Sequence, residues 1–185
     1  MIVVMGIDPG LAHTGFGVVR VAGGSMSAID GGVVEAPGGA PAGDRLARIH
    51  SSLAELIEWH EPAAVALEDL YFGKNVRSAI AVGQARGVAM LAAAQAEVPC
   101  FGYTPQAVKM SVCGSGAADK AQVQNMVGAL LSLPKPPESD HAADALAVAI
   151  CHASHARRAP AFGPAAREGE VPLPVDGVGA AEAAG

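Results

Sequence analysis

Three strand-forming runs separated by short turns occupy the first 35 residues of the chain. Apolar residues fill positions 2–7, and further strand-forming runs follow over 14–21 and 25–35. Pro9-Gly10 and Gly23-Gly24 lie between the runs, where tight turns are needed. Strands joined by such short connections pair antiparallel, so this segment predicts a three-stranded meander.

Helix and strand signals alternate after the meander. The expected elements are a helix over 43–60, a strand over 63–68, a helix over 76–97, a strand over 98–103, a short helix starting at Pro105 with Thr104 as N-cap, and helices over 119–132 and 140–156. Further caps are expected at Asn75 and at Ser139 or Asp140, and a loop over 113–116. The order βββαβαβααα predicts an α/β domain with a mixed five-stranded sheet and helices on its faces.

We expect one domain over residues 1–156, followed by a disordered tail over 157–185 that is rich in Ala, Gly and Pro. No apolar run reaches the length of a membrane span, and the first residues lack the basic start and cleavage site of a signal peptide. The three cysteines are odd in number and scattered in apolar surroundings, which indicates reduced thiols. A cytoplasmic protein is therefore expected.

The net charge is −6, but the basic residues gather in the middle of the chain. Residues 71–135 carry six basic and two acidic side chains, whereas residues 1–70 carry three basic and nine acidic ones. A basic segment between acidic ends suits a metal-dependent nuclease, because cations offset the carboxylates and the basic segment meets phosphates. Chance clustering of solvated charge is the alternative explanation.

Four potential metal ligands stand at the ends of the expected elements. Asp8 ends the first apolar run, and Glu68 ends the strand over 63–68. His141 and Asp144 are three residues apart at the start of the last helix, so they share a helix face. Three carboxylates and an imidazole can hold a pair of Mg²⁺ or Mn²⁺ ions beside a phosphodiester.

Each of these residues has an expected role. A carboxylate that bridges two ions must be rigid, which favours the strand residue Asp8, while Glu68 and Asp144 each bind an ion. His141 is either a ligand or the group that handles the proton of the attacking water. Asp69 is expected on the opposite side of its strand from Glu68. Taken singly, such residues are usually turn, cap or structural residues, and it is their joint placement that predicts a site.

Two other features allow more than one interpretation. Gly83 and Gly87 are four residues apart on one helix and permit close approach of another helix, either within the chain or from a second copy. Cys151, His152 and His155 have the residue types of a zinc site, but histidines at a helix end also interact favourably with the helix dipole. The second explanation is the simpler one.

Short motifs over about residues 1–156 make the chain similar to the RuvC family of Holliday-junction resolvases. The matching segments are Gly-Ile-Asp-Pro-Gly (6–10), Thr-Gly-Phe-Gly-Val (14–18), Leu-Glu (67–68), Phe-Gly-Lys-Asn (72–75), Ser-Ala (78–79), Gly-Gln-Ala-Arg-Gly-Val-Ala (83–89), Val-Lys (108–109), Lys-Ala-Gln-Val-Gln (120–124) and Ala-Ala-Asp-Ala-Leu-Ala (142–147). They follow the family's order, and the segment over 83–89 is highly specific.

The resemblance implies a ribonuclease-H-like fold, dependence on Mg²⁺ or Mn²⁺, and a homodimer formed through the helix with the two glycines. It implies paired symmetric nicks across a four-way DNA junction in recombination and repair, leaving ligatable 5′-phosphate and 3′-hydroxyl ends. The implied partners are the RuvA and RuvB branch-migration proteins. Asp8, Glu68 and Asp144 match the family's catalytic acids, and His141 stands where relatives have Asp or His.

The resemblance also implies DNA contacts. Phe72 matches an aromatic residue that stacks on bases near the junction centre, with Tyr71 as an alternative. Lys109 and Lys120 match basic residues near the DNA backbone, and Arg86 is either structural or touches a phosphate. The expected DNA-binding residues are Phe72, Lys74, Asn75, Arg77, Arg86, Lys109 and Lys120.

Three other functions compete with that of a resolvase. Actin-like and sugar-kinase ATPases also place an Asp-x-Gly turn after a strand, but they need a second domain and a second such turn, which this sequence lacks. A non-catalytic junction-binding module would have a broken ligand set, whereas all four positions here hold competent ligands. A nuclease for RNA–DNA hybrids shares the fold, and the Phe72 segment and the helix with the two glycines argue against it, mainly through the resemblance.

Overall fold

The computed structural model describes residues 1–69 and 76–156, with only the backbone of Arg77. Its strands are β1 (Ile2–Asp8), β2 (His13–Ala22), β3 (Ser25–Glu35), β4 (Ala64–Glu68) and β5 (Cys100–Tyr103). Its helices are α1 (Ala42–His60), α2 (Val76–Gln95), α3 (Pro105–Cys113), α4 (Lys120–Leu130) and α5 (Asp140–Ala156). Within these described residues, no helix is both long and apolar enough to cross a bilayer.

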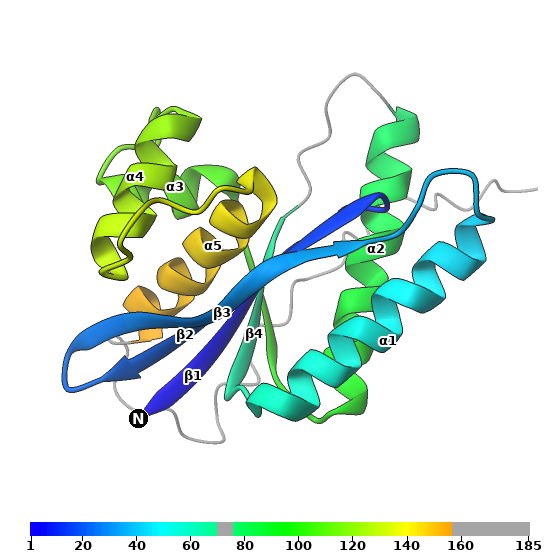
Figure 1. The fold of residues 1–185 in the computed structure, drawn as a ribbon, viewed down its shortest axis with the longest axis horizontal. Helices are drawn as coiled ribbons and strands as arrows, with labels where there is room; N and C mark the ends of the chain where they lie inside the picture. Colours follow the sequence, from blue (N-terminus) through cyan, green and yellow to red (C-terminus); the bar gives the residue numbers. More distant parts are fainter. Residues whose placement is uncertain (70–75, 157–185) are drawn as a thin grey trace, which may run out of the picture.

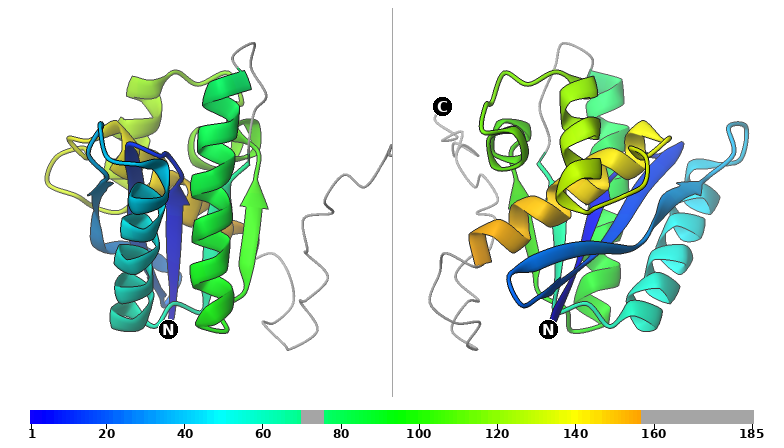
Figure 2. Two further views of the ribbon diagram at one scale, coloured as in Figure 1. Left: turned by 90° about the vertical axis from the view of Figure 1, so that its right-hand side faces the viewer. Right: turned by 60° about the vertical axis from the view of Figure 1, so that its left-hand side comes forward.

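The five strands form one mixed sheet in the order β3-β2-β1-β4-β5 (Figure 1). β1, β2 and β3 pair antiparallel, while β4 runs parallel to β1 and β5 runs parallel to β4. α1 and α2 cover one face of the sheet, and α5, backed by α3 and α4, covers the other (Figure 2). The predicted order of elements and the mixed α/β sheet are confirmed.

Each face of the sheet has its own core because side chains alternate along a strand. In β1, the fully buried Met5 and Ile7 belong to the core with Ile49 and Leu53 of α1, whereas Val4 belongs to the core under α5. This alternation decides which face each functional side chain reaches.

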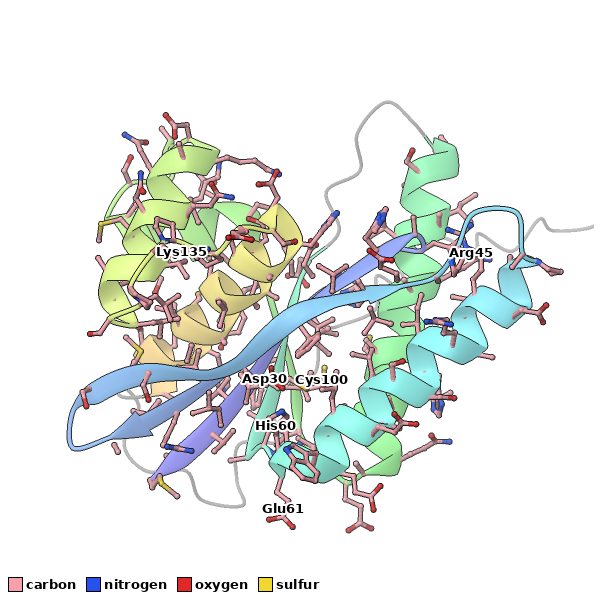
Figure 3. The ribbon with its side chains drawn as sticks, in the orientation of Figure 1. Asp30, Arg45, His60, Glu61, Cys100 and Lys135 are labelled. Atoms are coloured by element: carbon pink, nitrogen blue, oxygen red, sulfur yellow. The ribbon has the colours of Figure 1, made fainter. Side chains whose placement is uncertain are left out.

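Two side-chain contacts fasten α1 to its neighbours. His60 Nε2 lies 2.8 Å from Asp30 Oδ2 of β3, and both side chains are labelled in Figure 3. His50 Nε2 lies 2.7 Å from Gln95 Oε1 at the end of α2. These contacts link α1 to the edge strand β3 and to the neighbouring helix α2.

Three glycines let α5 lie directly against the strands. Gly6 of β1 and Gly17 of β2 are paired, and Gly15 lies opposite the last residue of β1. A Cβ at Gly6 would overlap the carbonyl oxygen of Ala145, and one at Gly15 would overlap the carbonyl oxygen of His141. The first turn of α5 is therefore held close to the carboxyl end of β1.

The expected element bounds agree with the observed ones within two residues. Thr104 caps α3 as predicted, since its hydroxyl accepts a hydrogen bond from Ala107 N at 3.2 Å. The placement of Cys113 in a loop is wrong. Cys113 is the last residue of α3, and Gly114, with a φ of 71°, ends the helix in the left-handed conformation.

The prediction of Asp140 as a helix cap is also wrong. Ser139 Oγ accepts the hydrogen bond from Ala142 N at 3.5 Å, so Ser139 is the cap. The Asp140 carboxylate instead accepts a hydrogen bond from Gln124 Nε2 of α4 at 2.7 Å. The expected cap at Asn75 and the tail over 157–185 lie outside the described residues.

Candidate active site

Asp8 and Glu68 lie at the same edge of the sheet. β1 and β4 are parallel neighbours with Ile7 opposite Leu67, so the next residue of each strand emerges at the carboxyl edge. Ile7 and Leu67 both belong to the core on the α1 and α2 side. Asp8 and Glu68 therefore point to the opposite side, toward α5.

The turn after Asp8 is closed by Thr14. The buried Thr14 hydroxyl donates to Gly10 O at 2.7 Å and accepts from Gly10 N at 3.4 Å. This turn delivers His13, whose ring stacks on that of His141 with centroids 5.6 Å apart and planes 13° apart. His13 is a site residue that the sequence does not predict, because a stacked partner leaves no spacing signal in the sequence.

The N-terminal end of α5 supplies His141 and Asp144. His141 Nδ1 lies 2.8 Å from Asp8 Oδ2, and the two side chains are 45% and 18% exposed. Because an ionised carboxylate only accepts hydrogen bonds, Nδ1 carries the hydrogen, and the Nε2 of a neutral ring then keeps its lone pair. The site is thus partly open to solvent, and the imidazole is oriented by Asp8.

The carboxylates of the site repel one another. Burial raises the pKa of Glu68 to about 7, and the negative charges of Asp8 and Asp144 act in the same direction. Burial also raises the pKa of Asp144, and the charge of Asp8 adds to this effect. Burial and mutual repulsion thus both disfavour the ionised forms of Glu68 and Asp144.

Lys109 of α3 and Lys120 of α4 lie beside the acidic cluster. Both ammonium groups act to lower the pKa of Glu68, in opposition to its burial. Lys120 Nζ lies 3.2 Å from Asp140 Oδ2 and 3.9 Å from Asp144 Oδ2. α3 and α4 thus place positive charge next to the three carboxylates.

The donor chemistry of the site fits a hard divalent cation. Carboxylate oxygens are ligands that Mg²⁺ and Mn²⁺ prefer, and a neutral imidazole nitrogen is accepted by Mn²⁺. In residues 1–69 and 76–156, no three His, Cys, Asp or Glu side chains are already grouped so that they could hold an ion. The residues at this edge of the sheet therefore supply suitable donor atoms, but the described side chains are not gathered around one point.

The residues considered for zinc make other contacts. His155 Nδ1 lies 2.8 Å from the carbonyl oxygen of Cys151, one helical turn earlier. His152 Nδ1 lies 2.7 Å from the hydroxyl oxygen of Tyr103. These contacts are the ordinary ones of a helix end packed on a strand.

The remaining expected DNA-binding residues fall in two groups. Phe72, Lys74, Asn75 and the alternative Tyr71 lie outside the described residues, and Arg77 is described only as backbone of α2. Arg86 lies on the far side of the sheet from the acidic cluster, where its Nη2 donates to Asp69 Oδ1 at 2.8 Å. Asp69 accordingly faces away from Glu68, as expected.

Comparison with known proteins agrees with this arrangement. A family model described as crossover junction endodeoxyribonuclease RuvC matches residues 4–152. The chain is 49% identical over 152 residues to the crossover junction endodeoxyribonuclease RuvC of Pelotomaculum thermopropionicum, covering 82% of this chain and 93% of that protein. It is 50% identical over 159 residues to the protein of the same name from Chloroflexus aggregans, covering 86% and 97%.

Solved structures give the same result. The structure of T. thermophilus RuvC in complex with Holliday junction substrate has a TM-score of 0.82 and 41% identity, covering 85% of this chain and 96% of that one. The yeast mitochondrial Holliday junction resolvase Ydc2 shares the fold, with a TM-score of 0.56 and 14% identity over 84% of this chain and 83% of that one. The mixed sheet is the ribonuclease-H-like fold expected from the sequence. The chain belongs to the RuvC family of crossover junction endodeoxyribonucleases.

Proposed function

We propose that this chain resolves four-way DNA junctions in recombination and repair, through paired symmetric nicks that leave 5′-phosphate and 3′-hydroxyl ends. The observation that carries the proposal is the meeting of Asp8, Glu68, His141 and Asp144 at one sheet edge, where their charges interact. Membership of the RuvC family, and the structure of a relative with Holliday junction substrate, support a junction as the substrate.

Asp8, Glu68, Asp144 and His141 would hold two Mg²⁺ or Mn²⁺ ions, with Asp8 as the bridging ligand. Two such ions supply the positive charge that activates a water and stabilises the leaving 3′-oxygen. The chain contributes a rigid backbone for these ligands, because Asp8 and Glu68 lie at strand ends and the glycines let α5 pack directly against the sheet. Lys109 and Lys120 are placed to neutralise phosphate oxygens next to these ligands.

His141 suits both roles expected for it. The hydrogen bond from Nδ1 to Asp8 fixes the ring, so Nε2 has a defined direction. That nitrogen can bind an ion or accept the proton of the attacking water. The ring of His13 stacks on the same imidazole.

The active form would be a C₂ dimer that contacts through α2. Val76, Ile80 and Leu91 are 69%, 58% and 50% exposed, and they lie on one face of this helix. A Cβ at Gly87, on the same face, would meet nothing within 4 Å. Gly87 therefore serves no close packing inside the described part of the chain, which favours contact with a second copy. Two matched sites on a nearly two-fold junction suit two matched cuts.

We expect Ile80→Asp to convert the dimer to monomers. Burying a charge in the apolar centre of an interface costs about 2–4 kcal/mol, so the dimer should dissociate at roughly 30- to 1000-fold higher concentration. Analytical ultracentrifugation measures this directly. Trp59→Asp is the matched control, because Trp59 is 82% exposed on α1 and lies outside the proposed interface. Equal dissociation constants for Ile80→Asp and wild type would contradict the α2 interface.

Metal affinity should depend on pH through Glu68. A metal binds the carboxylate and not the acid, so the apparent affinity for Mn²⁺ should fall as the pH drops below the Glu68 pKa of about 7. The raised pKa also affects folding in the absence of metal. Protonated Glu68 stabilises the folded state fully below pH 4.5, the pKa of the unfolded chain, and this contribution is lost as the pH rises through 7. Calorimetry with Mn²⁺ in the absence of DNA should show that the Mn²⁺ affinity falls about tenfold for each pH unit below 7.

Glu68→Gln is the control for this pH dependence. The amide does not titrate, so the variant should bind Mn²⁺ more weakly and lose the dependence between pH 5 and 7 that Glu68 causes. Constant Mn²⁺ affinity for the wild type over this range would contradict the proposed role of Glu68.

A panel of substrates separates the candidate functions. Wild type with Mg²⁺ or Mn²⁺ should cut a mobile four-way junction, and it should leave a matched duplex and an RNA–DNA hybrid intact. Tight junction binding without cutting in either metal would favour a non-catalytic binding module. Cleavage of the hybrid would favour another nuclease of the same fold.

Two further parts of the proposal rest on family membership alone. They are cooperation with the RuvA and RuvB branch-migration proteins, and a cytoplasmic location. Co-purification of the three proteins on junction DNA tests the first part.

A further inference from the structure

Arg86 and Asp69 form an ion pair on the face of the sheet opposite the acidic cluster. Arg86 Nη2 lies 2.8 Å from Asp69 Oδ1, and the two side chains are 12% and 31% exposed. Arg86 Nη1 also donates to Met90 Sδ at 3.3 Å, one turn further along α2. The guanidinium is therefore enclosed and directed at one carboxylate.

Asp69 is the residue that follows Glu68. Glu68 pairs with Tyr103 of β5, and Asp69 N donates to Tyr103 O at 2.8 Å. Alternation along the chain sends the Glu68 side chain toward α5 and the Asp69 side chain toward α2. A contact that restrains the Asp69 side chain therefore also restrains the backbone of the adjacent residue, Glu68.

The neighbouring strand has a glycine, Gly102, next to this ion pair. A Cβ at Gly102 of β5 would overlap Asp69 Oδ1 and would lie 3.1 Å from Arg86 Nη2. Cys100, labelled in Figure 3, is two residues earlier on the same face of the strand. Burial raises the pKa of Cys100 to about 11, and the nearby positive charge of Arg86 opposes that rise.

This position argues against contact between Arg86 and DNA. The guanidinium lies in the α2 layer, whereas Lys109 and Lys120 lie with the acidic cluster in the α5 layer. With only 12% of its side chain exposed, Arg86 has little surface left for a phosphate.

We propose that Arg86 is a positioning residue for the metal site. By holding Asp69, it fixes the carboxyl end of β4 and hence the direction of Glu68. It also joins α2, the helix of the proposed dimer contact, to the edge of the sheet where the ligands stand. This inference rests on the proposed function of the acidic cluster.

Arg86→Gln tests the proposal, with Arg48→Gln on the exposed surface of α1 as the matched loss of charge. A displaced ligand costs about 10²-fold in rate, so kcat on the junction should fall by about that factor while the junction Kd stays within threefold. Mn²⁺ affinity without DNA should fall about tenfold, as for other residues that orient metal ligands. Arg48→Gln should change none of these quantities.

The double variant Arg86→Gln with Asp69→Asn separates positioning from phosphate contact. It removes both charges and allows an amide–amide hydrogen bond, so it should recover much of the lost Mn²⁺ affinity and kcat. If Arg86 instead contacts a phosphate, the variant should bind the junction with a higher Kd, and the slope of log affinity against log salt concentration should fall by about one. The double variant should then recover neither Mn²⁺ affinity nor kcat. That result would overturn the proposal.

Two other outcomes are equally decisive. A lower melting temperature for Arg86→Gln, with unchanged Mn²⁺ affinity and unchanged kcat of the folded protein, would reduce the pair to a purely structural role. If wild type does not cut junctions, the proposed function fails, but the Mn²⁺ measurements still decide whether Arg86 positions Glu68.

Discussion

Asp8→Asn should reduce junction cleavage by about 10³-fold or more while junction binding persists. The substitution removes the charge of the proposed bridging ligand, and two-metal catalysis draws several kcal/mol of transition-state stabilisation from such a ligand set. The shape of the site should survive, because the amide oxygen of Asn can still accept the hydrogen bond from His141 Nδ1. Loss of one negative charge also leaves the attraction of Lys109 and Lys120 for DNA intact or stronger.

Single-turnover cleavage and junction affinity should be measured on the same preparation of Asp8→Asn. Asp44→Asn is the matched control, since Asp44 is exposed in the first turn of α1 and away from the site. It should cut within about twofold of wild type. If Asp8→Asn kept more than a tenth of the wild-type rate, Asp8 could not be the bridging ligand.

Gly15→Ala should damage stability and activity together. The added methyl would overlap the carbonyl oxygen of His141, which belongs to the helix backbone and cannot rotate away. Overpacking of this kind costs about 3 kcal/mol. A shift of α5 by about 1 Å would also move His141 and Asp144, which should lower the cleavage rate of the folded fraction by about 10²-fold.

Denaturant unfolding measures the change in the free energy of unfolding. The cleavage rate is then measured at temperatures below the unfolding transition, where the variant is folded. Gly6→Ala meets the carbonyl oxygen of Ala145 one turn further along and should cost similar stability. Gly43→Ala is the control, because a Cβ there meets nothing and the position lies in α1. It should be neutral or stabilising by up to about 1 kcal/mol. Wild-type stability in Gly15→Ala would refute the close contact of α5 with the strands.

The strand ends of the site could be predicted because Asp8 and Glu68 each follow an apolar run. The parallel pairing of β1 with β4 then places both at one edge. His141 and Asp144 were predictable from their offset within one helix. These positions depend only on where each strand or helix begins and ends, which the local sequence indicates.

The contacts between distant segments could not be predicted in the same way. Asp69 and Arg86 are 17 residues apart on different elements, and only the structure shows that they meet. Asp140 follows the cap residue Ser139, and its carboxylate contacts Gln124 and Lys120 of α4, which the sequence does not reveal. The role of Gly15 likewise depends on the distance between α5 and β2, which the spacing of apolar residues in the sequence does not predict.

Mapping and religating the cuts that wild type makes in one mobile four-way junction tests whether this chain is a resolvase. End-labelling each of the four strands locates every nick, and DNA ligase then tests the ends. We predict nicks at matching positions in two strands of like polarity, dependent on Mg²⁺ or Mn²⁺ and sealed by ligase without further processing. Junction binding without nicks, or unmatched nicks that ligase cannot seal, would contradict the proposed resolvase activity.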